Sequence, residues 1–241
     1  MTDRLVVAHV CPFYREIHGD VAGGQVSLAF RWASITPEHW LLKAMTMQGS
    51  PVMHTRNLLT KWALDDQGAV EGPGRADEKG PPADILLWQD ADVVATPEEM
   101  VELVRVLAGA PDDVGAVAAP VLLGTEGQVH HNISFRDNPN SLPVFMAQRP
   151  VECSLAGFGL IATRAAVFHA IGFPWFEWGY RGGIEHCIGE DMGWCEKAKL
   201  AGFSVFAHGG VAPSHVFQRK FRITKESMAA LAYSQPERKT P

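Results

Sequence analysis

The chain of 241 residues contains few cysteines, no long apolar run and no excess of positive charge. Its four cysteines are scattered and include no C-x-x-C pair, which predicts reduced thiols rather than a disulfide framework. No apolar run approaches the roughly 18 to 20 residues of a membrane-spanning helix, and the first residues lack the features of an export signal. These absences predict a cytoplasmic protein that is neither secreted nor integral to a membrane.

The charge balance argues against a protein that binds the phosphate backbone of nucleic acids. The 21 basic and 27 acidic side chains give a net charge of −6, whereas phosphate-backbone binding needs a positive field. A composition of 46% apolar and 20% charged residues excludes disorder and coiled coil and indicates a globular chain with a sizeable core. Histidine is abundant, with ten residues, and the composition alone leaves their task open.

Strand-like apolar runs alternate with helix-like amphipathic segments, which is typical of an α/β layer. Strands are expected at residues 5–10, 39–46, 84–89, 114–119, 157–163 and 203–208, and helices at 25–33, 53–64, 164–171 and 190–201. A further helix begins after Thr96, where Thr96 as the N-cap and Glu99 form a capping box around Pro97. No repeat or linker divides the chain, so residues 1–241 are predicted to form one domain.

Three segments follow neither the helical nor the strand period. Residues 65–83 set glycines and prolines among seven charged side chains, which predicts a mobile surface loop. Residues 124–150 are polar, with an alternation at 132–136 that suggests an edge ribbon. Residues 172–189 are rich in aromatic residues and glycine, and residues 234–241 are expected to form a tail.

The sequence Asp90-Ala91-Asp92 directly follows the strand expected at 84–89. In an extended segment, residues i and i+2 point to the same side, so both carboxylates project together from the carboxyl end of a buried strand. Open α/β sheets bind ligands at that edge. Two carboxylates about 6 Å apart repel by roughly 3 kcal/mol at an effective dielectric near 20, which favours a divalent cation there. The alternative is a solvated acidic turn before Thr96.

A second group of polar residues consists of Glu190 and Asp191, followed by His215. Acidic side chains in the first turn of a helix are common, because they interact favourably with the helix dipole. Their place after an aromatic, glycine-rich segment, with His215 in a loop beyond the next strand, favours a functional interpretation. His215 is the better candidate for a metal ligand, whereas His208 is expected to be a core residue.

The order of these motifs resembles nucleotide-sugar glycosyltransferases of the GT-A fold, close to the family 2 group and its short phage and bacterial relatives. The matching stretches are G-G-Q-V-S-L-A-F near residue 25, H-T-R-N-L-L around 56–57, D-A-D at 90–92, G-F-G-L-I-A-T-R at 157–164 and G-E-D-M-G-W-C-E-K-A-K-L-A-G-F at 189–203. The resemblance implies a single GT-A (Rossmann-like) domain, with a mixed, mostly parallel sheet flanked by helices.

The resemblance also implies a donor site with a bound metal ion. Asp92 and His215 are the implied ligands of Mn²⁺ or Mg²⁺. Asp90 is implied to hold the ribose of a nucleoside-diphosphate sugar or to reach the metal through water. Arg56 and Asn57 match the segment that lines the nucleotide pocket. No clear acidic residue for recognition of the base follows the first strand, although Glu16 and Asp20 are candidates.

The implied activity is the transfer of a sugar, of the hexosyltransferase type, to an acceptor hydroxyl. Asp191 occupies the place of the general base of inverting members, with Glu190 next to it as the reserve candidate. Residues 176–189, which include Trp178 and Tyr180, are a candidate lid. The acceptor is left open among a glycan, a lipid, a protein and a modified DNA base, as is the oligomeric state. Residues 124–189 or a partner protein would recognise the acceptor.

Three other interpretations remain open. A metal-dependent nucleotide phosphohydrolase would also use Asp90, Asp92 and His215, and would act without an acceptor. A non-catalytic nucleotide-sugar binding protein would keep the fold without turnover. A zinc site is the third, although the spacing of its candidate ligands fits no common zinc finger; they are His186, Cys187, Cys195 and His208.

Overall fold

The computed structural model describes residues 4–14, 16–65, 81–125, 128–135, 149–180, 187–217 and 219–222. Most of the expected mobile loop, residues 66–80, lies outside the described residues, as do the tail 234–241 and residues 181–186 of the candidate lid. The helices are α1 (Gly19–Ile35), α2 (Val52–Leu64), α3 (Pro97–Ala108), α5 (Ala165–Ile171) and α6 (Glu190–Leu200).

A seven-stranded sheet has the order β2-β1-β3-β11-β5-β14-β9. Its strands are β1 (Leu5–Phe13), β2 (Trp40–Gln48), β3 (Ile85–Gln89), β5 (Val114–Ala118), β9 (Pro150–Cys153), β11 (Leu160–Arg164) and β14 (Ser204–His208). β1 is parallel to β2 and β3, and β14 is parallel to β5, whereas β11 is antiparallel to both of its neighbours and β9 to β14. Five strands therefore run one way and two the other, which confirms the predicted mixed, mostly parallel sheet.

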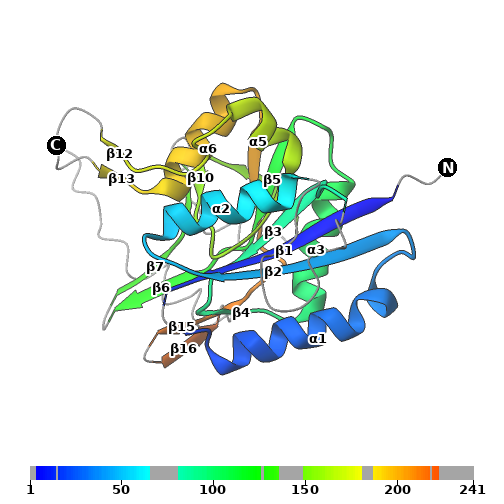
Figure 1. Ribbon diagram of the computed structural model, residues 1–241. Coiled ribbons are helices and arrows are strands. Elements are labelled where there is room, and N and C mark those ends of the chain that lie inside the picture. The colour runs from blue at the N-terminus through cyan, green and yellow to red at the C-terminus, as the bar shows by residue number, and fades with distance from the viewer. Residues whose placement is uncertain are drawn as a thin grey trace.

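Short strands form the smaller sheets. β4 (Val93–Val94), β15 (Ser214–Phe217) and β16 (Arg219–Arg222) make a three-stranded sheet, which Figure 1 shows close to the beginning of α1. Three pairs complete the set: β6 (Leu122–Thr125) with β7 (Gln128–His131), β8 (Ile133–Ser134) with β10 (Leu155–Ala156), and β12 (Gly179–Tyr180) with β13 (Cys187–Ile188).

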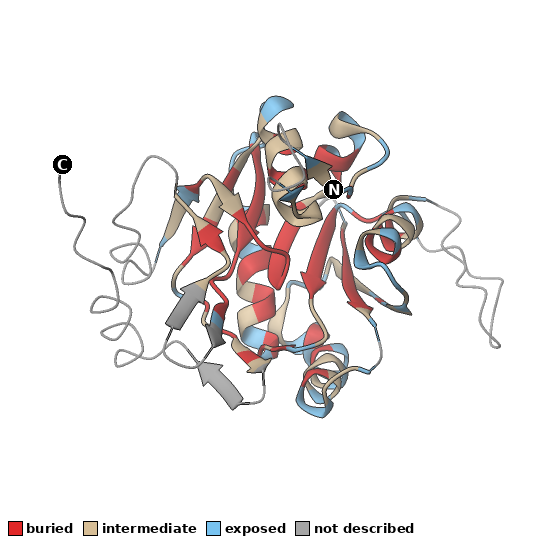
Figure 2. Cartoon of the chain, turned by 90° about the vertical axis from the view of Figure 1, so that its left-hand side faces the viewer, coloured by how far each residue is buried: buried red, intermediate tan, exposed pale blue. Residues whose placement is uncertain are grey.

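Helices cover both faces of the large sheet, and its strands are correspondingly buried (Figures 1 and 2). Successive side chains of β3 point to opposite faces of the sheet. Leu86 and Trp88 pack with α2, α5 and α6, whereas Ile85 and Leu87 pack with α1 and α3. A strand that is buried on both faces reads as a continuous apolar run, which is how β3 is recognised in the sequence.

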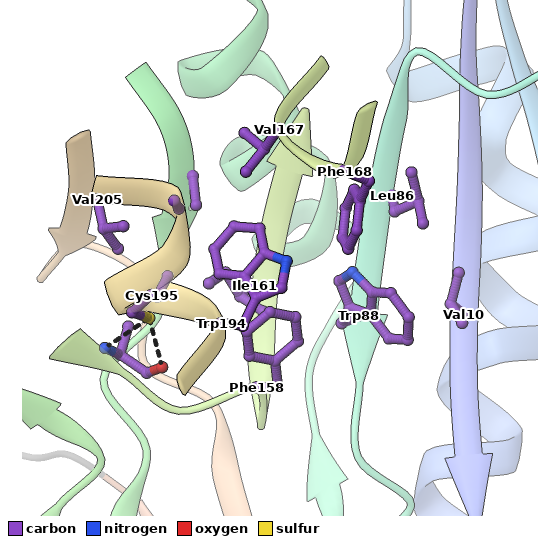
Figure 3. Packing of buried hydrophobic residues seen from close by; sticks show 14 of the residues in the cluster. Val10, Leu86, Trp88, Phe158, Ile161, Val167, Phe168, Trp194, Cys195 and Val205 are labelled. Atoms are coloured by element: carbon purple, nitrogen blue, oxygen red, sulfur yellow. Dashed lines mark hydrogen bonds between the residues drawn. The ribbon is translucent and has the colours of Figure 1, made fainter. Parts of the chain in front are cut away.

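An aromatic cluster fastens α6 to the sheet (Figure 3). Phe158 packs edge-on against Trp88 of β3, with ring centroids 5.6 Å apart, and against Trp194 of α6, at 5.1 Å. Beside it, the buried thiol of Cys195 interacts with the backbone of Ala156. Phe176 joins the same cluster 5.0 Å from Phe158. The start of α6 is therefore held at a fixed place relative to the end of β3.

The predicted capping box at the start of α3 is confirmed. The backbone N–H of Glu99 donates to Oγ1 of Thr96 over 3.2 Å, and the N–H of Thr96 donates to Oε2 of Glu99 over 2.8 Å. Gly202 ends α6 with a positive φ of 91°, which a residue with a Cβ adopts only with strain. Several bounds differ from expectation. β9 was not expected and begins at the last residue of the polar stretch, and β11 begins at Leu160 rather than residue 157. β1 continues to Phe13 rather than ending at residue 10, and α1 begins at Gly19 rather than residue 25.

Candidate active site

A cavity of about 670 Å³ opens at the carboxyl ends of β1 and β3. This is the edge at which open α/β sheets bind ligands. Its walls also include the start of α2, the start of α6 and β15. The lining residues are Pro12, Phe13, Tyr14, Glu16, His18, Gly49, Val52, Arg56, Asp90, Ala91, Asp92, Glu190, Asp191 and Val216.

The Asp90-Ala91-Asp92 turn is held by backbone hydrogen bonds on both sides. The N–H of Asp90 donates to the carbonyl of Gly159 over 2.9 Å, and the N–H of Val93 donates back to the carbonyl of Asp90 over 3.0 Å. The carbonyl of Ala91 accepts from the N–H of His18, just before α1, over 3.1 Å. The turn therefore joins β3 to the helix that follows β1.

His215 lies beside Asp92 because β15 pairs with β4. The antiparallel register places His215 opposite Val93, and the N–H of Val216 donates to the carbonyl of Asp92 over 2.7 Å. Nε2 of His215 then lies 3.2 Å from Oδ2 of Asp92. The imidazole is buried, whereas the side chain of Asp92 is half exposed to the cavity.

The Asp92–His215 pair has the spacing of two neighbouring ligands of a divalent cation. Ligands at about 2.1 Å from an octahedral ion, at right angles to each other, lie about 3.0 Å apart. One imidazole beside carboxylate oxygen suits Mn²⁺. Within the described part of the chain, no three His, Cys, Asp or Glu side chains are grouped as a complete metal site. A cation here would take its remaining ligands from substrate or water.

Arg56 is a buried cation that joins two walls of the cavity. Its Nη2 lies 2.8 Å from Oδ1 of Asp90, and its Nη1 lies 2.7 Å from Oε1 of Glu190. The guanidinium also stacks over Phe158 and Phe176, with ring centroids 5.3 and 5.9 Å away. Only 4% of the side chain is exposed, so α2 delivers one positive charge to the interior of an acidic site.

Glu190 and Asp191 are neighbours in sequence with different surroundings. Both carboxylate oxygens of Glu190 accept hydrogen bonds from side chains, one from Arg56 and the other from Nε1 of Trp178 over 3.2 Å. Oδ1 of Asp191 accepts from the backbone N–H of Met192 over 2.7 Å. Among the described residues, no side chain donates a hydrogen bond to Asp191. Both acids line the cavity, but both carboxylate oxygens of Glu190 already accept hydrogen bonds from protein side chains, whereas Asp191 accepts one from the backbone.

Burial and charge set the protonation of these groups. Burial raises the pKa of Asp191 above its ordinary value, with Arg56 opposing and Glu190 adding to the shift. Burial also raises the pKa of Asp90, against the opposing effect of Arg56. Burial alone would lower the pKa of Arg56, but Asp90, Glu190 and Asp191 outweigh it and raise that pKa, so Arg56 stays charged. A carboxylate whose pKa moves toward neutrality suits a general base.

Asn57 is separate from the other predicted site residues. Its Nδ2 donates to the carbonyl of Phe176 over 2.7 Å, and its Oδ1 accepts from the N–H groups of Trp175 and Phe176, both over 3.1 Å. It lines another cavity, of about 540 Å³, on α2. Its side chain supports residues 175–176 instead of facing the first cavity.

The structure brings most of the other predicted residues together around one cavity, although Asp20 is not among its lining residues. Arg56, Asp90, Asp92, Glu190 and Asp191 line it, and His215 contacts Asp92. Glu16 lines it as well. Residues 12–14 and His18 also line the cavity and were not predicted as site residues. Their signal was their position directly after the first strand, at the same sheet edge as Asp90.

The zinc alternative gains no support from the described residues. Cys195 is buried, and its thiol donates a hydrogen bond to the backbone carbonyl of Ala156, whereas Cys187 is exposed on β13. His208 lies 3.6 Å from Glu102, on the other side of the sheet from Cys195. His186 lies outside the described residues.

Comparisons with known proteins identify the fold. No family model matches the chain, and a search of curated proteins finds no match. Among solved structures, A197 from STIV is similar with a TM-score of 0.55 and 13% identity, over 92% of this chain and 91% of that one. GalNAc-T7, solved with UDP, GalNAc and Mn²⁺, is similar with a TM-score of 0.55 and 12% identity, over 90% of this chain and 45% of that one.

These likenesses show that the chain has the GT-A fold, as its resemblance to nucleotide-sugar glycosyltransferases implies. The chain spans less than half of the GalNAc-T7 chain. At such identities, function has to be argued from the site. No helix among the described residues is long and apolar enough to cross a membrane.

Proposed function

We propose that the protein is a metal-dependent glycosyltransferase that moves a sugar from a nucleoside-diphosphate sugar to an acceptor hydroxyl. The observation that carries this proposal is one cavity, at the carboxyl edge of a GT-A sheet, that joins the Asp92–His215 pair to Asp191. The likeness to GalNAc-T7, whose structure contains UDP, GalNAc and Mn²⁺, supports the same donor chemistry.

Asp92 and His215 would hold Mn²⁺ or Mg²⁺ together with oxygens of the donor diphosphate. When bound, the cation neutralises the charge that develops on the departing nucleoside diphosphate. Asp90 would orient the ribose or reach the cation through water, from a carboxylate that Arg56 holds in place. The wall after β1, with the exposed ring of Tyr14, is then available to the nucleoside.

Asp191 would act as the general base of an inverting transfer. It takes the proton of the acceptor hydroxyl while the hydroxyl oxygen bonds to the anomeric carbon of the sugar. The bond from that carbon to the β-phosphate oxygen breaks, and its electron pair leaves with the nucleoside diphosphate. A positioned base contributes roughly 10² to 10⁴ in rate. The hydrogen bonds that occupy both oxygens of Glu190 favour Asp191 over Glu190.

We further propose a location for the protein and a role for residues 176–189. The chain would work in the cytoplasm, where its four free cysteines, three of them buried, stay reduced. Residues 176–189 would close over bound substrates, and protection of this segment from protease by nucleotide plus Mn²⁺ would support that role.

The test is a thermal-shift and calorimetric screen of nucleoside diphosphates with and without Mn²⁺, followed by incubation with the matching sugar nucleotides. We expect one nucleotide to bind only with the cation. Release of inorganic phosphate from the nucleotide without an acceptor would instead identify a phosphohydrolase. Binding with no turnover of any sugar nucleotide, by transfer or by hydrolysis, would identify a non-catalytic binding protein.

A further inference from the structure

Trp178 presents an exposed ring whose orientation is fixed from inside the protein. It stands at the start of the β12–β13 hairpin, which Figure 1 shows projecting beyond α6. The side chain is 52% exposed, yet its indole nitrogen donates to Glu190 over 3.2 Å. Glu190 is itself held by Arg56. A ring that is oriented before binding loses little freedom when a ligand stacks on it.

The ring lies beside the proposed base rather than in the donor cavity. The indole donates to Glu190, which lines the same cavity as Asp191, so the ring stands at the edge of that cavity on the side of the proposed base. Both acids line the cavity, whereas Trp178 is not among the lining residues. A molecule that offers a hydroxyl to Asp191 can therefore extend over the indole. Tyr180, 59% exposed, lies two residues further along the same hairpin.

The charge of the cavity determines which kind of molecule fits. Its described lining includes five acidic residues, and the lining cation Arg56 is already paired with two of them; the acids are Glu16, Asp90, Asp92, Glu190 and Asp191. The cation proposed at Asp92 and His215 would offset the charge of the donor diphosphate, but it leaves the other acids uncompensated, so an anionic acceptor such as nucleic acid or an acidic lipid headgroup would be repelled here. A neutral ring with C–H groups on one face and hydroxyls at its edge meets no such repulsion.

Resting on the proposed function, we infer that Trp178 forms the acceptor subsite and that the acceptor is a neutral saccharide stacked on its indole. Hydroxyls on the far side of the stacked sugar ring then reach Asp191. A nucleobase also stacks on aromatic rings. Tyr14, which lines the cavity after β1, is the aromatic residue placed for the donor base.

The test compares Trp178→Ala and Trp178→Phe with Phe30→Ala, a control at an 85% exposed aromatic position on α1. Acceptor probes are neutral oligosaccharides of glucose, galactose and N-acetylglucosamine, with hyaluronan oligosaccharides and short single-stranded DNA as anionic probes. We expect transfer to a neutral saccharide, with its KM raised about tenfold or more in Trp178→Ala and less in Trp178→Phe. The nucleotide Kd with Mn²⁺ should change less than twofold, and Phe30→Ala should resemble the wild type.

Three results would overturn the inference. The first is transfer only to an anionic probe or to no saccharide, the second is an unchanged saccharide KM in Trp178→Ala, and the third is an equal loss of nucleotide binding in that variant. Failure of the underlying function looks different, because the wild type would then bind no nucleoside diphosphate with Mn²⁺. Thermal unfolding of each variant, with Trp178→Phe as the smaller change, separates loss of the subsite from loss of the fold.

Discussion

The guanidinium of Arg56 lies 2.8 Å from the carboxylate of Asp90 and connects it to Glu190, although the two acids are a hundred positions apart in the chain. Arg56 thus ties the turn after β3 to the first residue of α6. Both walls of the cavity depend on this one buried charge. The contacts of its guanidinium with Phe158 and Phe176 connect that charge to the aromatic core beneath.

Arg56→Met is expected to destabilise the fold by about 3 kcal/mol or more, because it leaves two carboxylates without their buried partner. Arg56→Lys should lose less, since it keeps the charge but not the two-pronged geometry. The control is Arg31→Met, which removes an exposed ion pair with Glu98 that is worth at most about 1 kcal/mol. Urea unfolding at pH 7 measures all three. Equal losses in Arg56→Met and Arg31→Met would contradict the assigned role.

Asp92→Asn is expected to abolish Mn²⁺-dependent nucleotide binding, because a neutral amide is a far weaker cation ligand than a carboxylate. His215→Phe should have the same effect, since it removes the imidazole and keeps a ring of similar size. Asp112→Asn, at an exposed acidic position before β5, is the matched control for charge. Calorimetric titration with the nucleotide, with and without Mn²⁺, gives the comparison. Metal-dependent binding that survives in Asp92→Asn would place the cation elsewhere.

Local signals in the sequence predicted much of the fold, and non-local pairing explains the rest. The capping box at Thr96 and the buried run of β3 depend on neighbouring residues, so pattern alone finds them. The reversed direction of β11 depends on its pairing with β3 and β5, which no local pattern encodes. Asp90 and Asp92 were recognisable from their place after a strand, whereas the distance from Asp92 to His215 depends on the pairing of β4 with β15.

Asn57 shows the same limit at a single position. It is adjacent to Arg56 in sequence, and the resemblance assigns both to the nucleotide pocket. Successive residues of a helix point about 100° apart, so Arg56 reaches the first cavity while Asn57 supports residues 175–176. Sequence proximity on α2 therefore did not imply a shared surface.

One of the ten histidines should make the fold sensitive to mild acid. His9 is buried in β1 next to Gln89, 2.9 Å away, and burial lowers its pKa from 6.5 to about 4. Between these two values the unfolded chain binds the proton of His9 and the folded chain does not. The free energy of unfolding therefore falls as the pH falls from about 6.5 toward 4. The loss should reach about 2 kcal/mol at pH 5. Urea unfolding at pH 7.5 and pH 5 should show a smaller pH dependence in His9→Gln, and equal dependence would exclude His9 as the cause.

Asp191 should determine the acid limit of activity. A base works only when ionised, so kcat/KM should rise with pH through the pKa of Asp191 in the free enzyme. Burial raises that pKa, so the acid limb of the pH–rate profile should lie above the pKa of about 3.9 typical of aspartate. Arg56 lowers the same pKa, and Arg56→Met should therefore move the limb to higher pH, while Arg56→Lys should move it less.

The pH dependence of transfer is measured in wild type, in both Arg56 variants and in Asp191→Asn. Asp191→Asn should bind the nucleotide with Mn²⁺ nearly as the wild type does, yet transfer roughly 10² to 10⁴ more slowly and without this limb. Its surroundings favour that separation, since the described side chains around Asp191 donate no hydrogen bond to it that the amide would break. If Asp191→Asn keeps both its rate and the acid limb, the proton goes to another group, and the assignment of the base is wrong.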